Sequence, residues 1–166
     1  KLNFQINVGD RVALVGKNGS GKTSIIKIIL GEKIPYIGDI SISSIKISYV
    51  CQNTEEVKGN ISEYAKKYNV NESIFRAMLS KLGVNTSGFE RNISNMSEGQ
   101  KKKVLIARSI SESADLYIWD EPLNYIDVIS REQIEKMLLK YKPTMIFVEH
   151  DETFKNKIAT KVINLE

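Results

Sequence analysis

The sequence predicts an α/β fold, in which a mainly parallel sheet is covered by helices and accompanied by a small antiparallel β region. Short apolar runs such as "LYIWD" and "TMIFVEH" flank a helical pattern over about 128–141. This alternation is typical of parallel sheets, because the crossover between parallel strands is usually a helix. Residues from about 57 to 113 show helical patterns only. We therefore expect a single domain over 1–166 with an inserted helical lobe at about 57–113.

The first strand and helix enclose a glycine-rich loop. "RVALVG" is a buried-strand pattern, and "SIIKIIL" is an apolar helix that ends at Gly31. Between them, "GKNGSGKT" matches G-x-x-x-x-G-K-[ST], whose backbone N–H groups curl around phosphate oxygens. A chance glycine loop is the alternative, and the strand–loop–helix order disfavours it. The predicted nucleotide-binding residues are Asn18, Gly19, Ser20, Gly21, Lys22, Thr23 and Ser24.

The next segment, "GDISISSIKISYVCQ", alternates apolar and polar residues on both sides of Ser43-Ser44. Period-two alternation around a polar pair predicts an antiparallel hairpin. The following helical patterns include "NESIFRAMLSKLG", with Asn71 as a candidate N-cap and Gly83 as a candidate stop. After "TMIFVEH", a short helix from Asp151 and a last strand in "KVINL" complete the predicted elements.

Two carboxylates follow the apolar strand "LYIWD", where open α/β sheets bind their ligands. Asp120 is placed to hold Mg²⁺ through water, and the Thr23 hydroxyl would face the same ion. Glu121 is placed to orient or deprotonate an attacking water. A solvated strand end is the alternative, and the phosphate loop upstream favours the functional interpretation.

Two further polar residues also stand at predicted strand ends. Gln52 ends "ISYVCQ", and its amide could ligate the metal, although glutamine is common at strand ends. His150 is the only histidine, and a lone histidine is more often structural than catalytic. At the end of "TMIFVEH", however, a neutral imidazole could hydrogen-bond a γ-phosphate and hold the attacking water.

The segment "MSEGQKKK" is the most diagnostic motif. Ser97 and Gln100 form a capping box that opens a helix, and a well-capped helix is the simplest interpretation. Gly99 lacks a side chain, so a phosphate could approach this helix N-terminus closely. A domain with two half-sites predicts that two domains pack head to tail, each completing the other's site.

The order of these motifs resembles the nucleotide-binding domain of ATP-binding cassette (ABC) ATPases, a P-loop NTPase fold, across essentially the whole chain. The resemblance implies ATP and Mg²⁺ as cofactors, and catalytic roles for Glu121 and His150. It implies that Gln52 is the Q-loop glutamine and that Asp127 is the D-loop aspartate. Ser97, Gly99 and Gln100 would be the signature that contacts the ATP of a partner domain.

Within that family, "MSEGQKKK" and "WDEPLNYID" with Asn124 resemble the second ATPase domain of ABC-F antibiotic-resistance proteins. This implies a second ABC domain and the ribosome as partners. The alternative is the ATPase subunit of a membrane transporter, which would contact a membrane domain. Glu98 stands where family signatures usually have glycine, and it could repel the γ-phosphate or point outward. Lys101, Lys102 and Lys103 are either a solvated helix face or an RNA-facing patch.

Bulk properties agree with one soluble domain. No apolar run approaches the roughly 20 residues that span a bilayer. The only cysteine, Cys51, excludes an internal disulfide framework and suits a reducing cytosol, so we expect a cytoplasmic protein. The net charge of +4 (24 basic minus 20 acidic residues) is only a weak bias toward anionic partners. Because the chain begins at Lys1 and not at a methionine, we expect it to be a fragment of a longer protein. Each site of this fragment would lack the signature of its partner, so we expect it to bind ATP weakly and to turn over slowly.

Overall fold

The computed structural model describes residues 2–85 and 90–165, and within these residues five strands form one sheet. The strand order is β2-β3-β4-β1-β5, and every neighbouring pair is parallel, which confirms the predicted α/β fold with a parallel sheet. The strands are β1 (Arg11–Val15), β2 (Ile47–Val50), β3 (Leu116–Asp120), β4 (Met145–Val148) and β5 (Lys161–Asn164).

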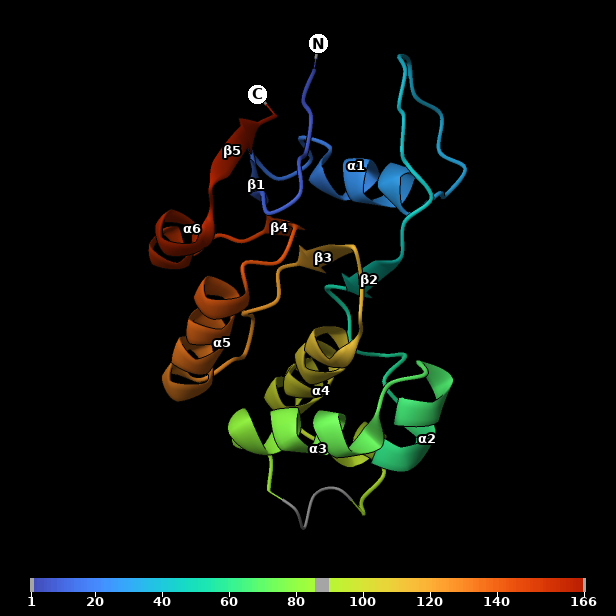
Figure 1. Cartoon of the computed structure of the whole chain (residues 1–166), viewed down its shortest axis with the longest axis vertical. Helices are drawn as coiled ribbons and strands as arrows, with labels where there is room; N and C mark the ends of the chain where they lie inside the picture. Colours follow the sequence, from blue (N-terminus) through green and yellow to red (C-terminus); the bar gives the residue numbers. More distant parts are fainter. Residues whose placement is uncertain (1, 86–89, 166) are drawn as a thin grey trace.

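Helices cover both faces of this sheet (Figure 1). Helix α1 lies on one face, and α2 to α5 gather on the other. Alternate residues of β3 divide between the two layers, because Ile118 packs in the cluster with α1 and Trp119 packs in the larger cluster. The helices are α1 (Lys22–Ile29), α2 (Ile61–Lys67), α3 (Glu72–Lys81), the 3-10 helix η2 (Ile93–Asn95), α4 (Glu98–Ser111), α5 (Val128–Tyr141) and α6 (Glu152–Ile158).

The antiparallel hairpin predicted around Ser43-Ser44 is wrong. Only Ile47–Val50 is a strand in this segment, and it pairs in parallel with β3. Residues 32–46 form a loop that extends away from the sheet between α1 and β2 (Figure 1). Ile40 and Ile42 are both 43% exposed, so no described layer buries one side of a hairpin here. A two-stranded hairpin without such a layer is only marginally stable, whereas pairing with β3 buries Val50 completely.

The predicted caps are confirmed. The Asn71 side chain accepts the N–H of Ile74 at the start of α3, and Gly83 directly follows the C-cap residue Leu82. Helix α5 has the predicted bounds. Helices α2 to α4 lie within the range predicted for an inserted lobe, yet they share one apolar cluster with the sheet. The division into sheet domain and lobe therefore stays a prediction.

Candidate functional site

The glycine-rich loop joins β1 to α1 at the carboxyl edge of the sheet. Gly19 and Gly21 have positive φ angles of 81° and 99°, which L side chains rarely adopt. A Cβ atom at either position would meet nothing within 4 Å, so the space over the loop is open. No side chain caps α1 and no acidic residue lies in its first turn. The N–H groups of that turn are therefore available to an anion.

Two polar groups of the loop lack the partner that a phosphate would supply. The Lys22 amine is buried and donates to the carbonyl oxygens of Gly16 (2.7 Å) and Lys17 (2.9 Å). The Ser20 hydroxyl is buried and has no hydrogen-bond partner among the described residues. A phosphate over the loop would accept from the Lys22 amine, which lines the adjoining cavity, so the residues present fit this group.

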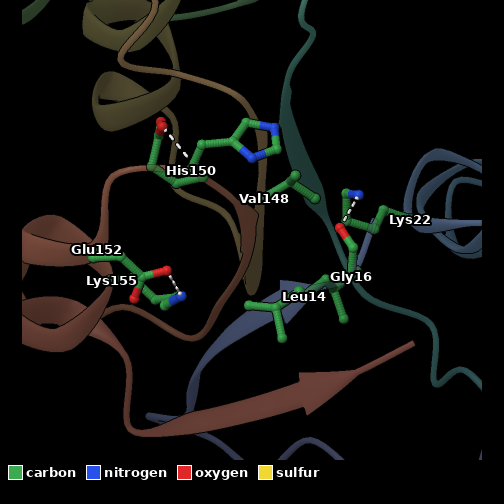
Figure 2. Close-up of a pocket in the computed structure, with 9 residues that line it drawn as sticks. Leu14, Gly16, Lys22, Val148, His150, Glu152 and Lys155 are labelled. Carbon is green, nitrogen blue, oxygen red and sulfur yellow. Dashed lines mark hydrogen bonds and ion pairs between the residues drawn. The ribbon is translucent and has the colours of Figure 1, made fainter. Parts of the chain in front are cut away.

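A cavity of about 140 Å³ adjoins the loop between the ends of β1 and β4. Figure 2 shows Gly16 and Lys22 on one side of it and Glu152 and Lys155 on the other. The residues that line the cavity are Leu14, Val15, Gly16, Lys22, Val148, Glu149, His150, Glu152 and Lys155. His150 therefore faces the same space as the phosphate loop, although His150 lies 126 positions after Ser24 in the sequence (150 − 24).

Both predicted acidic residues lie at the end of β3. Asp120 is 3% exposed, and burial together with the charge of Glu121 raises the pKa of its carboxyl above the ordinary value. The ammonium groups of Lys102 and Lys22 oppose this rise. Glu121 has a φ of 49°, in the left-handed region, and its N–H donates to the Val148 carbonyl at 2.9 Å. Such a backbone costs on the order of 1–3 kcal/mol and is often retained at functional sites.

The Glu121 carboxylate gathers three side chains. Its Oε2 accepts from Gln52 Nε2 and from Asn124 Nδ2, both at 2.9 Å. Its Oε1 lies 3.2 Å from His150 Nε2. Gln52, Glu121 and His150, which the sequence analysis placed at three separate strand ends, thus meet in one cluster.

Glu149 organises the loops around this cluster, and the sequence analysis missed it. Its buried carboxylate accepts the backbone N–H groups of Leu123 (3.2 Å), His150 (2.9 Å) and Asp151 (3.4 Å). It therefore fixes the turn after Glu121 to the end of β4. A charged residue directly after the fully buried run "MIFV" was the available signal.

The candidate metal ligands carry oxygen atoms. Thr23, Gln52 and Asp120 offer a hydroxyl, an amide and a carboxylate, which are the ligands that Mg²⁺ prefers. Among the described residues, no group of three or more His, Cys, Asp or Glu side chains could hold a metal ion. The donor set thus fits Mg²⁺, which usually takes one or two carboxylates and completes its shell with phosphate and water.

The signature segment forms the predicted capping box. Ser97 Oγ accepts from the Gln100 N–H at 3.2 Å, and Gln100 Oε1 accepts from the Ser97 N–H at 3.1 Å. Gly99 is needed for close packing, because a Cβ there would lie 2.5 Å from the Tyr125 carbonyl oxygen. The signature turn therefore packs against the loop that leads to Asp127.

The three lysines after the signature have three different acceptors. Neither alternative from the sequence holds for Lys102, because it is 1% exposed and burial lowers the pKa of its amine. Their partners are Glu98 for Lys101 (3.0 Å), the Cys51 carbonyl for Lys102 (3.0 Å) and Asp127 for Lys103 (2.6 Å). Lys102 and Lys103 fasten α4 to neighbouring segments, whereas the Lys101 pair lies within α4, and the three amines do not form an open basic patch.

Asp127 and Glu98 are both engaged within the chain. Asp127 caps α5 by accepting the Ser130 N–H at 2.9 Å, and the ion pair with Lys103 holds the pKa of its carboxyl far below the ordinary value. Glu98 accepts from the Thr54 hydroxyl and pairs with Lys101, and both contacts lower the pKa of its carboxyl.

Comparison with known proteins decides the family. The family described as "ABC transporter" matches residues 1–124. The chain belongs to this family. The "Ribosome protection protein VmlR" of Bacillus subtilis (strain 168) is 35% identical over 162 residues, covering 93% of this chain and 29% of that protein. The "ABC transporter F family member 2" of Arabidopsis thaliana is 28% identical, covering 99% of this chain and 25% of that protein.

Solved structures of this family share the fold. The archaeal ribosome recycling factor aABCE1, solved in complex with the stalk protein aP1, gives a TM-score of 0.78 at 26% identity over 96% of this chain and 32% of that chain. An ATP-binding subunit of an ABC transporter gives 0.82 at 22% identity, which shows the fold alone. The chain spans 25–33% of the length of the first curated relatives that it matches. No helix among the described residues is long and apolar enough to cross a membrane.

Proposed function

We propose that this chain binds and hydrolyses ATP with Mg²⁺, as one half of an ABC-type ATP sandwich. The observation that carries the proposal is the cluster in which the Glu121 carboxylate meets Gln52 and His150 beside the phosphate loop. Asp120, Lys22 and the open loop at Gly19 and Gly21 add the groups that phosphoryl transfer needs.

Different residues of the chain would have different roles in ATP binding and hydrolysis. The loop N–H groups would bind phosphate oxygens, while the Lys22 amine would exchange its carbonyl partners for the outer phosphates. Glu121 would orient the attacking water and accept its proton. His150 would hydrogen-bond the γ-phosphate. Mg²⁺, held by Thr23, Gln52 and Asp120, supplies charge neutralisation when bound.

A second domain would complete the site. The start of α4 carries Ser97, Gly99 and Gln100. The carboxylate of Glu98 in the same turn contacts Thr54 and Lys101. We propose that this turn contacts ATP bound by the partner domain, and that Asp127 lies at the same junction. The partner is either another ABC domain of a longer protein or a second copy of this chain.

We further propose that the protein is cytoplasmic, that it acts on the ribosome as an ABC-F protein, and that it protects ribosomes against antibiotics. The support comes from relatives, since one is named a ribosome protection protein, another an F family member, and aABCE1 is described as a ribosome recycling factor. In the competing role, an ATPase subunit of a membrane transporter, the chemistry would be the same and the partner different.

Co-sedimentation tests both parts of the proposal. The full-length Glu121→Gln protein keeps the shape of the cluster but loses the base, so hydrolysis should fall by about 10²–10⁴-fold while ATP binding persists. This trapped protein should pellet with purified ribosomes only when ATP is present. Lys22→Ala, which removes the phosphate-facing amine, is the negative control. Rapid hydrolysis by Glu121→Gln would remove Glu121 from its role, and ATP binding without pelleting would favour the transporter subunit.

A further inference from the structure

Helix α4 holds the chain on both sides of Gln52. On one side, the Cys51 carbonyl accepts from Lys102 Nζ at 3.0 Å. On the other, the Thr54 hydroxyl donates to the Glu98 carboxylate. Glu98 and Lys102 are four residues apart in one helix, so their side chains lie on the same face, one turn apart. The segment 51–54 therefore runs along that face with two side-chain attachments.

The Lys102 attachment is buried, whereas the Thr54 attachment ends on Glu98, whose side chain is 52% exposed. The Lys102 side chain is 1% exposed and Thr54 is 7% exposed. A buried amine that donates to a carbonyl is charge-assisted, and such hydrogen bonds are stronger than neutral ones. Lys101 Nζ donates to the second oxygen of the Glu98 carboxylate, Oε1, at 3.0 Å. The position of segment 51–54 relative to α4 is therefore set by specific contacts.

Gln52 itself has no such support from burial. Its side chain is exposed, and its amide donates to Glu121 at 2.9 Å. An exposed glutamine loses rotamer entropy when it makes a contact, and a backbone that is already fixed lowers the total entropic cost of that contact. We propose that Glu98 and Lys102 are positioning residues, which clamp segment 51–54 to α4 and thereby hold the Gln52 amide against Glu121.

The clamp gives a reason for the glutamate in the signature turn. A glycine at residue 98 could not reach Thr54, so only the Lys102 contact would remain. With Glu98 present, segment 51–54 is attached to α4 at two residues, Glu98 and Lys102, which lie one helical turn apart. A displacement of Gln52 therefore reaches Ser97 and Gly99 at the start of the same helix.

The contacts can be tested without nucleotide by NMR of the whole chain labelled with ¹⁵N-glutamine, which gives side-chain signals from only four residues: Gln5, Gln52, Gln100 and Gln133. Glu121→Ala, which removes the acceptor, defines the Gln52 signal of a released amide. Lys102→Met keeps side-chain length but removes the amine, and Thr54→Val removes only the hydroxyl. Lys157→Met is the matched control, because it breaks the ion pair with the buried Glu135 away from this segment.

We expect the Gln52 signal in Lys102→Met and in Thr54→Val to move toward its position in Glu121→Ala, and to stay unchanged in Lys157→Met. An unmoved Gln52 signal in a folded Lys102→Met protein would overturn the clamp. If Lys102→Met does not fold, Thr54→Val decides in the same way, since it changes a single hydroxyl.

The catalytic consequence rests on the proposed ATPase function and is measured separately. Groups that orient a ligand or catalytic residue typically contribute about 10–100-fold to affinity or activity. Lys102→Met should therefore lower ATP turnover by about that factor, and the loss should not add to that of Gln52→Ala. Additive losses would contradict the clamp. If the parent protein did not bind ATP, the proposed function would be refuted. If the Gln52 signal still moved in Lys102→Met, the clamp would nevertheless be supported.

Discussion

Replacing Gly99 with alanine has two effects of opposite sign on the free energy of unfolding. Alanine is favoured over glycine in a helix by about 1 kcal/mol, and Gly99 lies in the first turn of α4. The new Cβ, however, would lie 2.5 Å from the Tyr125 carbonyl oxygen, a backbone atom that cannot rotate away. Ordinary contacts begin near 3.4 Å, so α4 and the Tyr125 loop must separate by about 0.9 Å (3.4 − 2.5). Overpacking of this kind costs about 1–3 kcal/mol, which leaves a net destabilisation of about 1 kcal/mol.

Thermal and urea unfolding of Gly99→Ala measure this net effect. A loss of about 1 kcal/mol corresponds to a fall in Tm of about 2–4 °C for a domain of this size. Gly31→Ala is the comparison, because its Cβ would meet open space and its cost comes only from a φ of +84°. Stabilisation of Gly99→Ala by about 1 kcal/mol, as helix propensity alone predicts, would refute the close contact between the signature turn and the Tyr125 carbonyl.

Three further variants, and a fourth for comparison, test other parts of the structure by chemical unfolding. Ser97→Ala removes the hydroxyl of the capping box and should lower the free energy of unfolding by about 1 kcal/mol; an unchanged value would contradict the cap. Asp127 has a folded pKa below its ordinary 3.8, so its stabilisation is present above about pH 4 and is lost as the pH falls further. The stability difference between the parent and Asp127→Asn should therefore shrink between pH 6 and pH 3, and a constant difference would argue against the Lys103 pair. Glu112→Gln leaves the buried Arg108 without its 3.1 Å carboxylate and should cost about 3 kcal/mol, whereas Glu32→Gln, in an exposed pair, should cost less than about 0.5 kcal/mol.

Local chemistry made much of the fold predictable. The bounds of α5, the Asn71 cap and the Ser97–Gln100 capping box follow from residues within one helical turn, and the sequence analysis predicted all of them correctly. The glycine loop was equally clear, because its spacing and its neighbours constrain one another. Where the decisive contact lies within four residues, sequence is sufficient.

The sequence predictions that were wrong concern residues whose structure depends on contacts with residues far away in the sequence. Alternation around Ser43-Ser44 satisfied the rule for a hairpin, but the partner of β2 is β3, some 70 residues downstream (Ile47 with Leu116). Neither alternative predicted for the lysines holds for Lys102 for the same reason, since its acceptor is the distant carbonyl of Cys51. Glu149 directly follows the apolar run of β4, but its role depends on the distant Leu123 loop, which folds against it.

The polar groups of the site are already bonded to one another, and this constrains how a ligand is taken up. The Lys22 amine holds two loop carbonyls, and the Glu121 carboxylate holds Gln52, Asn124 and His150. Binding of ATP must therefore exchange hydrogen bonds, and each exchange contributes only the net difference of about 0.5–1.5 kcal/mol. Among the described residues, most of the affinity would have to come from the free N–H groups at the start of α1. In the proposed function, the phosphate loop would therefore supply most of the affinity, and the contacts around Glu121 would have to rearrange when a phosphate binds.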